Sequence, residues 1–188
     1  MLWKVNPDWR PLSEARLMLM RRHGNVDRAI ERVSAALKNH PGLVYVRLRW
    51  RRRKSLDTAV ELLDGVPAKP PHAEKWWRER SILARRALGK GHISEAYRLV
   101  KVHGLEEGPA FAEAEWLAGW IALRFLGEKE DAFTHFTRLY DAVFMPISRA
   151  RAAYWAGRTA EAMDDREGAA LWYAQAAQYP GTYYGQLA

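Results

Sequence analysis

Small residues recur at a fixed period along this chain, and that period constrains the fold more than any other feature of the sequence. One alanine anchors the second helical segment of each predicted pair, at spacings of 30, 37, 37 and 37 residues: Ala29, Ala59, Ala96, Ala132 and Ala169. Four positions after each anchor stands an apolar or aromatic residue: Val33, Leu63, Val100, Phe136 and Tyr173. A fixed period with an apolar residue at a fixed offset is typical of an α-helical solenoid.

The repeating unit is clearest in residues 146–188, where small and aromatic residues recur at steps of three and four on both sides of a short acidic turn. That spacing marks one face of a helix. Gly157 and Ala169 are small enough to let two antiparallel helices approach closely, and Tyr173 is expected to fill the gap between them. We therefore predict a helical hairpin of the tetratricopeptide type, with Asp164 as the N-cap of its second helix.

The same pattern extends along the whole chain, so we predict an all-α fold, an α–α superhelix of tetratricopeptide-like hairpins. Before the last hairpin, helices are expected over 12–22, 26–38, 43–53, 56–64, 73–88, 93–103, 110–126 and 130–143. Prolines at positions 67, 70 and 71 make the stretch 66–72 non-helical and a candidate joint, because proline lacks an amide donor and restricts its neighbour. We otherwise expect a single solenoid domain over residues 1–188.

The composition excludes several classes of function but does not identify the function. The chain has 48% hydrophobic and 28% charged residues, as a folded protein does. It has no cysteine, which excludes thiolate catalysis, disulfides and cysteine-based metal sites. No sequence motif for a metal, phosphate-binding loop or catalytic serine is present, so we assign no catalytic residue, metal or cofactor. The net charge of +8 favours an anionic partner.

The candidate ligand-binding residues lie together in the last hairpin: Arg149, Arg151, Tyr154 and Arg158. Arginines beside aromatic rings can hold a sugar or a peptide. They can equally pair with the carbonyl groups at a helix end, which is a structural role. The tryptophan pairs at 76–77 and at 116 and 120 are instead expected to pack in the core.

A basic run occupies residues 47–54. On a helix, Arg47, Arg51 and Lys54 would share one face and could meet a polyanion. A solvated helix face is the preferred interpretation of this run.

Four segments resemble the superhelical (U-type) region of the soluble lytic murein transglycosylases, and they occur in the order of that family. The segments are 74–80 (EKWWRER), 112–123 (AEAEWLAGWIAL), 146–158 (PISRARAAYWAGR) and 184–188 (YGQLA). The resemblance runs from about residue 43 to the end of the chain, and residues 1–42 share only the general helical pattern.

The resemblance implies a bacterial periplasmic protein that acts on peptidoglycan. Enzymes of this family are lyases that cleave the β-1,4 bond between N-acetylmuramic acid and N-acetylglucosamine and leave a 1,6-anhydro product. Their catalytic glutamate belongs to a Glu-Ser motif in a domain that follows the YGQLA segment. This chain contains no Glu-Ser dipeptide. The resemblance therefore implies a peptidoglycan-binding scaffold, inactive alone, whose partners are glycan strands and a catalytic domain expected beyond residue 188.

The alternative is a stand-alone tetratricopeptide-like module that binds other proteins. A peptide-binding module is expected to carry a ladder of polar side chains, whereas a glycan-binding scaffold is expected to carry basic and aromatic ones. Nucleic acid is not an expected partner, because no base-reading pair of residues recurs with the 37-residue period. No apolar run is long enough to span a membrane.

Overall fold

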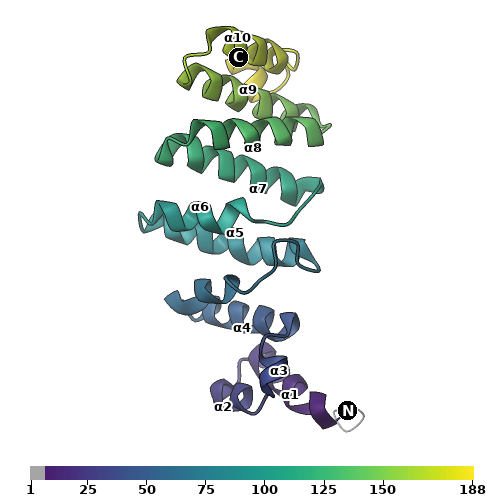
Figure 1. The fold of residues 1–188 in the computed structure, drawn as a ribbon. Helices are drawn as coiled ribbons and strands as arrows, with labels where there is room; N and C mark the ends of the chain where they lie inside the picture. The colour runs from purple at the N-terminus through teal and green to yellow at the C-terminus, as the bar shows by residue number, and fades with distance from the viewer. Residues whose placement is uncertain (1–6) are drawn as a thin grey trace. The chain divides into compact units, whose positions relative to one another are not determined.

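The structure is a computed structural model that describes residues 7–188, with the side chain of Asp8 left aside. These residues form helices and no strand, which confirms the predicted all-α fold (Figure 1). The chain divides into two compact units between Pro70 and Pro71. The division falls inside the proline-containing stretch 66–72.

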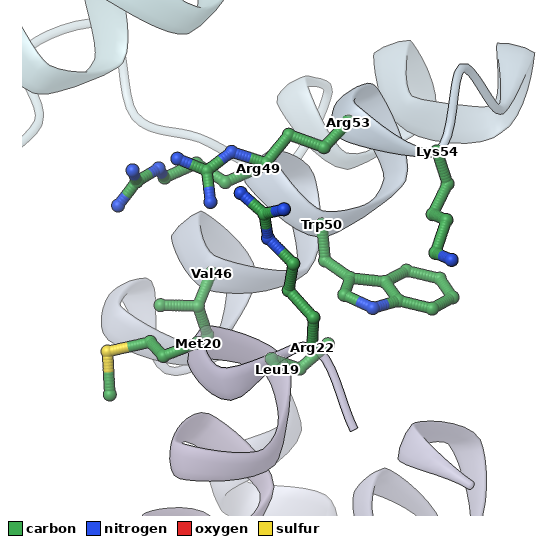
Figure 2. Close-up of a pocket in the computed structure, with 8 residues that line it drawn as sticks. All are labelled: Leu19, Met20, Arg22, Val46, Arg49, Trp50, Arg53 and Lys54. Carbon is green, nitrogen blue, oxygen red and sulfur yellow. The ribbon is translucent and has the colours of Figure 1, made fainter. Parts of the chain in front are cut away.

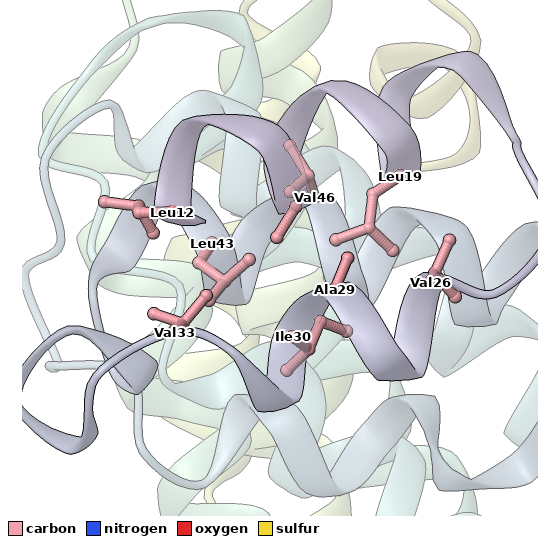
Figure 3. Close-up of a cluster of buried hydrophobic side chains, with 9 residues drawn as sticks. Leu12, Leu19, Val26, Ala29, Ile30, Val33, Leu43 and Val46 are labelled. Atoms are coloured by element: carbon pink, nitrogen blue, oxygen red, sulfur yellow. The ribbon is translucent and has the colours of Figure 1, made fainter. Parts of the chain in front are cut away.

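The first unit is built around helix α1 (Arg10–Arg21), which follows the short 3₁₀-helix η2 (Pro7–Trp9). Helices α2 (Val26–Glu31) and α4 (Pro41–Arg53) both pack on α1, and the 3₁₀-helix η3 (Asp57–Leu63) packs on α4. Their apolar faces meet in one cluster (Figure 3), formed by Leu12, Ala15, Leu19, Val26, Ala29, Ile30, Val33, Leu43 and Val46.

Two predicted helices of this unit differ from the structure. The segment 26–38 is broken between α2 and the short helix α3 (Ala35–Lys38), because Ser34 adopts an extended backbone with ψ of 149°. Serine favours helix starts over helix interiors, and Val33, just before the break, is buried in the core. The predicted helix 56–64 is the 3₁₀-helix η3, in which bonds span three residues instead of four.

The second unit contains three consecutive helical pairs. They are α5 (Ala73–Gly89) with α6 (Ile93–Lys101), α7 (Gly108–Ile121) with α8 (Lys129–Ala142), and α9 (Pro146–Ala162) with α10 (Arg166–Ala177). A π-helical turn, η4 (Ala122–Leu126), extends α7, and α11 (Tyr183–Leu187) is a short additional helix. Each helix from α5 to α10 packs on the next along the chain (Figure 1). None of the helices described is both long and apolar enough to cross a membrane.

Glycines and alanines occupy buried positions between packed helices. The five anchor alanines are buried, each with 5% or less of its surface exposed. A Cβ atom on Gly157 would lie 2.8 Å from the ring of Tyr173, and one on Gly119 would lie 2.8 Å from the ring of Phe136. The aromatic ring therefore occupies the space that a side chain would need, which confirms the predicted hairpin packing.

The N-cap of α10 is shifted by one residue from its predicted position. Asp165, and not Asp164, caps the helix by accepting a hydrogen bond from the amide of Gly168 at 2.9 Å. Asp164 instead has a φ of 63°, a left-handed conformation that aspartate tolerates better than most residues. The turn between α9 and α10 is one residue longer than the sequence pattern indicated.

Replacing Ala132 by leucine is expected to lower the free energy of unfolding by about 1–3 kcal/mol, because the added atoms overpack a fully buried position of α8. Urea unfolding followed by circular dichroism measures the change. Ala170→Leu is the control, since Ala170 is exposed on α10 and its replacement should change stability by less than about 0.5 kcal/mol. Equal effects of the two changes would mean that the inner faces are wrongly assigned.

Candidate functional site

All four predicted ligand-binding residues lie on α9, but they do not share one face. Arg151, Tyr154 and Arg158 follow one another at three and four residues and lie on one side. Arg149 precedes Arg151 by two residues, which is about 200° around a helix. Its guanidinium carbon lies 4.4 Å from the ring centre of Tyr140 on α8. The structure therefore brings three of the four residues together and places Arg149 elsewhere.

Tryptophans surround the three residues on the shared face. The guanidinium carbon of Arg151 lies 5.2 Å from the ring centre of Trp116 on α7. Trp116 stacks on Trp120 at 5.9 Å with 16° between the rings, and Trp155 meets Trp116 edge-on at 6.5 Å. All three indoles are half-buried. We call this region the tryptophan–arginine surface and define it as Trp116, Trp120, Arg151, Tyr154, Trp155, Arg158 and Tyr184.

The short helix α11 completes the surface at its other end. The Thr182 hydroxyl caps α11 by accepting a hydrogen bond from the amide of Gly185 at 3.1 Å. That cap fixes the start of the helix, and the ring of Tyr184 lies 5.3 Å from the ring of Tyr154. A shallow hollow of about 260 Å³ adjoins Tyr154, lined also by Arg158, Glu161, Tyr173, Leu187 and Ala188.

The two arginines of the surface differ in their electrostatic environment. Arg158 Nε lies 3.2 Å from a carboxylate oxygen of Glu161, and a hydrogen bond with the Tyr154 hydroxyl raises the pKa of Arg158. Burial lowers the pKa of Arg151 against the opposing effects of Tyr184 and Glu113, and no carboxylate of the described residues lies within ion-pair distance of it. Its Nε atom is buried without a hydrogen-bond partner there. Arg151 is thus a half-buried cation that lies over an indole ring, with the charge of Glu113 acting on it from beyond ion-pair distance.

Two tryptophans of this surface, Trp116 and Trp120, were predicted as core residues together with Trp76 and Trp77. Trp76 and Trp77 are core residues indeed, with 4% and 3% of their surface exposed. Trp116 and Trp120 are only half-buried, because a different stripe of α7 supplies the main packing face: Ala114, Leu117, Ala118 and Ile121. That stripe was visible in the sequence at helical spacing, and it left the two tryptophans on another side of the helix. Trp116 still packs against the core cluster of Ala112, Leu139 and Ala152.

A cluster of titratable side chains, separate from the tryptophan–arginine surface, lies around Glu115 in the second unit. The carboxylate is fully buried and lies 3.1 Å from His103 Nε2, 2.5 Å from His135 Nδ1 and 3.0 Å from Arg138 Nη1. Burial raises the pKa of Glu115, but the hydrogen bonds from His103 and His135 and the charges of His135 and Arg138 lower it to about 2. The sequence motifs did not reveal this cluster. Among the described residues, no group of acidic or histidine side chains is arranged to hold a metal ion.

No protein-family model matches the sequence, and no curated protein matches it. Among solved structures, the chain is similar to a Podosopora anserina protein with nearly identical TPR-like repeats, assigned to the kinesin light chains. The TM-score is 0.50 at 16% identity, over 94% of this chain and 97% of that one. A variant of the same protein gives 0.49 at 16% identity, over 90% and 92% of the two chains. At this identity the first likeness shows the fold alone, a tetratricopeptide-like helical repeat.

Proposed function

We propose that this chain is a protein-interaction module that binds an acidic peptide on the tryptophan–arginine surface. The observation that carries the proposal is Arg151, a half-buried guanidinium over the Trp116 ring with no carboxylate of the described residues within ion-pair distance. Desolvation of a cation is unfavourable unless an anion compensates it. A carboxylate of a bound peptide would supply that anion in the bidentate geometry that guanidinium groups favour.

The aromatic rings around Arg151 suit the rest of such a ligand. Tryptophan, tyrosine and arginine are the residues that most often dominate the binding energy of interfaces. Trp116, Trp120 and Trp155 each keep part of their surface exposed, so a ligand can bury further apolar area on them. The first helices α7 and α9 of two successive hairpins contact one another, which holds these rings on one rigid surface.

The test is a binding titration with synthetic peptides of equal length that differ in their number of carboxylates, followed by fluorescence polarisation. Arg151→Ala is expected to weaken binding of the acidic peptides about tenfold or more, because a central arginine contact is lost. Arg149→Ala is the matched control: it removes the same charge from the same helix, on the side facing Tyr140. Equal losses in both variants would show only a net-charge effect, and a lack of binding by every peptide would overturn the proposal.

A second candidate is the peptidoglycan-binding scaffold of a periplasmic lytic transglycosylase. Two observations favour it: the surface is basic and aromatic, as expected of a glycan-binding scaffold, and residues from three of the four segments that resemble this family lie in contact. Arg151 lies over Trp116, and Tyr154 lies against Tyr184. Flat sugar faces can stack on such rings, and the acidic stem peptides of peptidoglycan can pair with the guanidinium group. Under this proposal the chain binds glycan strands but does not cleave them, since it lacks the Glu-Ser motif.

Purified sacculi distinguish the two candidates in a second arm of the same experiment. The scaffold is favoured if the chain binds sacculi but not the peptides, and if this binding weakens in high salt and in the Arg151→Ala variant. Binding to the peptides alone favours the interaction module. Release of 1,6-anhydro products by the chain would contradict the proposed lack of cleavage.

A further inference from the structure

A basic hollow in the first unit is independent of the tryptophan–arginine surface. It has a volume of about 330 Å³ and lies where α1 and α4 end (Figure 2). Its lining contains three arginines, one lysine and no acidic residue: Leu19, Met20, Arg22, Val46, Arg49, Trp50, Arg53 and Lys54. A concave surface of this size with convergent charges of one sign is suited to a small anionic ligand.

Local structure explains why these side chains converge. Arg49 and Arg53 are four residues apart on α4, so they lie on the same side of that helix. Arg22 caps α1 in a left-handed conformation, with φ of 59°, and its guanidinium group lies on the same side as those of Arg49 and Arg53 in Figure 2. Lys54 follows Trp50 by four residues, and its side chain lies beside the indole. Like charges gathered in this way repel one another, and a bound anion would relieve the repulsion.

The helix ends themselves do not neutralise these charges. The C-terminus of a helix carries roughly −0.5 of an elementary charge, so α1 and α4 together supply about −1 against four formal positive charges. The dipole effect therefore accounts for only part of this arrangement.

The structure also changes which residues of the basic run are available to an anion. The sequence pattern placed Arg47, Arg51 and Lys54 on one face. Arg51 donates a hydrogen bond to the Thr58 carbonyl oxygen at 3.0 Å and lies 3.8 Å from a carboxylate oxygen of Glu61, so it holds α4 against η3. Burial lowers the pKa of Arg47, which does not line the hollow. Of these three residues, Lys54 alone belongs to the hollow.

We infer that this hollow binds a phosphate group carried by an organic molecule. Guanidinium groups match the oxygen geometry of phosphate, and the ammonium of Lys54 adds a further charge. Leu19, Met20 and Val46, together with the indole of Trp50, form an apolar wall that suits the organic part of the ligand. The phosphate can belong to a soluble compound or to a lipid headgroup.

Isothermal titration of the full chain with inorganic pyrophosphate tests the phosphate contact directly. We expect measurable binding in low salt that weakens about tenfold in Arg22→Gln and in Lys54→Gln, each of which removes one charge from the lining. Arg28→Gln is the control, because Arg28 is exposed on α2 of the same unit and lies outside the hollow. Circular dichroism confirms that each variant keeps its helices.

Co-sedimentation with phosphatidylcholine vesicles, with and without phosphatidic acid, identifies the source of the phosphate. Binding to pyrophosphate without binding to the vesicles assigns a soluble ligand. Binding to the phosphatidic acid vesicles that Arg22→Gln weakens assigns a lipid headgroup. Absence of binding to both probes, or an equal loss in Arg28→Gln, would overturn the inference.

Discussion

Replacing Glu115 by alanine is expected to lower the free energy of unfolding by about 3–5 kcal/mol, because the change leaves buried partners without their anion. His103 and His135 have only 4% and 7% of their surface exposed, and both lose a hydrogen bond. Arg138 Nη1 loses its carboxylate at 3.0 Å. Chemical unfolding in urea at neutral pH measures the difference between the variant and the unchanged chain.

Glu113→Ala is the matched control, since it removes the same side chain from the same helix two residues earlier. Glu113 accepts hydrogen bonds from Arg85 at 2.5 Å and from Trp77 at 3.1 Å, but its side chain and that of Arg85 are 46% and 49% exposed. The partly solvated pair with Arg85 contributes about 1 kcal/mol or less, and the Trp77 indole that loses its acceptor is a single neutral donor, so this change should cost less than Glu115→Ala. If both variants lost the same stability, burial of Glu115 would not be the cause.

The cluster around Glu115 joins two successive hairpins by polar contacts. His103 follows α6, Glu115 belongs to α7 and His135 belongs to α8. The Tyr97 hydroxyl on α6 donates a hydrogen bond to Asp131 at 2.9 Å and lies 3.3 Å from His135 Nε2, which extends the cluster. Apolar packing alone leaves a helix some freedom to rotate about its axis, whereas these directional contacts fix it.

The orientation of α7 about its own axis determines where one ring of the tryptophan–arginine surface lies. Trp116 is the next residue after Glu115, so the contacts that hold Glu115 inward determine where the Trp116 indole lies. Arg151 in turn rests on that indole at 5.2 Å. The buried cluster therefore positions a ring of the proposed binding surface, and Glu115→Ala is expected to disturb binding as well as stability.

The hairpins could be predicted from the sequence because their signal is periodic and local. Alanine anchors and the offset aromatic Tyr173 are enough to identify the pairs of helices. The Glu115 cluster could not be predicted in this way, because His103 and His135 lie 12 and 20 residues away and no spacing rule links them. Helix geometry alone indicates that Arg149 and Arg151 point to different sides of α9. The contact of Arg149 with Tyr140 could not be predicted, because Tyr140 belongs to another helix.

Acid is expected to destabilise the chain through Glu115 by on the order of 3 kcal/mol between about pH 4.5 and pH 2. Its pKa in the folded chain is lowered from the ordinary 4.5 to about 2. As the pH falls below about 4.5, the unfolded chain takes up a proton at this carboxylate while the folded chain does not. Glu115 therefore contributes its full stabilisation above that pH and loses it progressively towards about pH 2.

The Glu115→Gln variant isolates this contribution, because glutamine keeps the size of the side chain and does not titrate. Urea unfolding of both proteins at a series of pH values gives their difference in stability, which removes the titration of every other acid common to the two chains. We expect this difference to be large near pH 5 and to shrink by about 1.4 kcal/mol for each pH unit below about 4.5. A difference that stays constant between pH 5 and pH 2 would mean that the carboxylate is not held ionised by His103, His135 and Arg138.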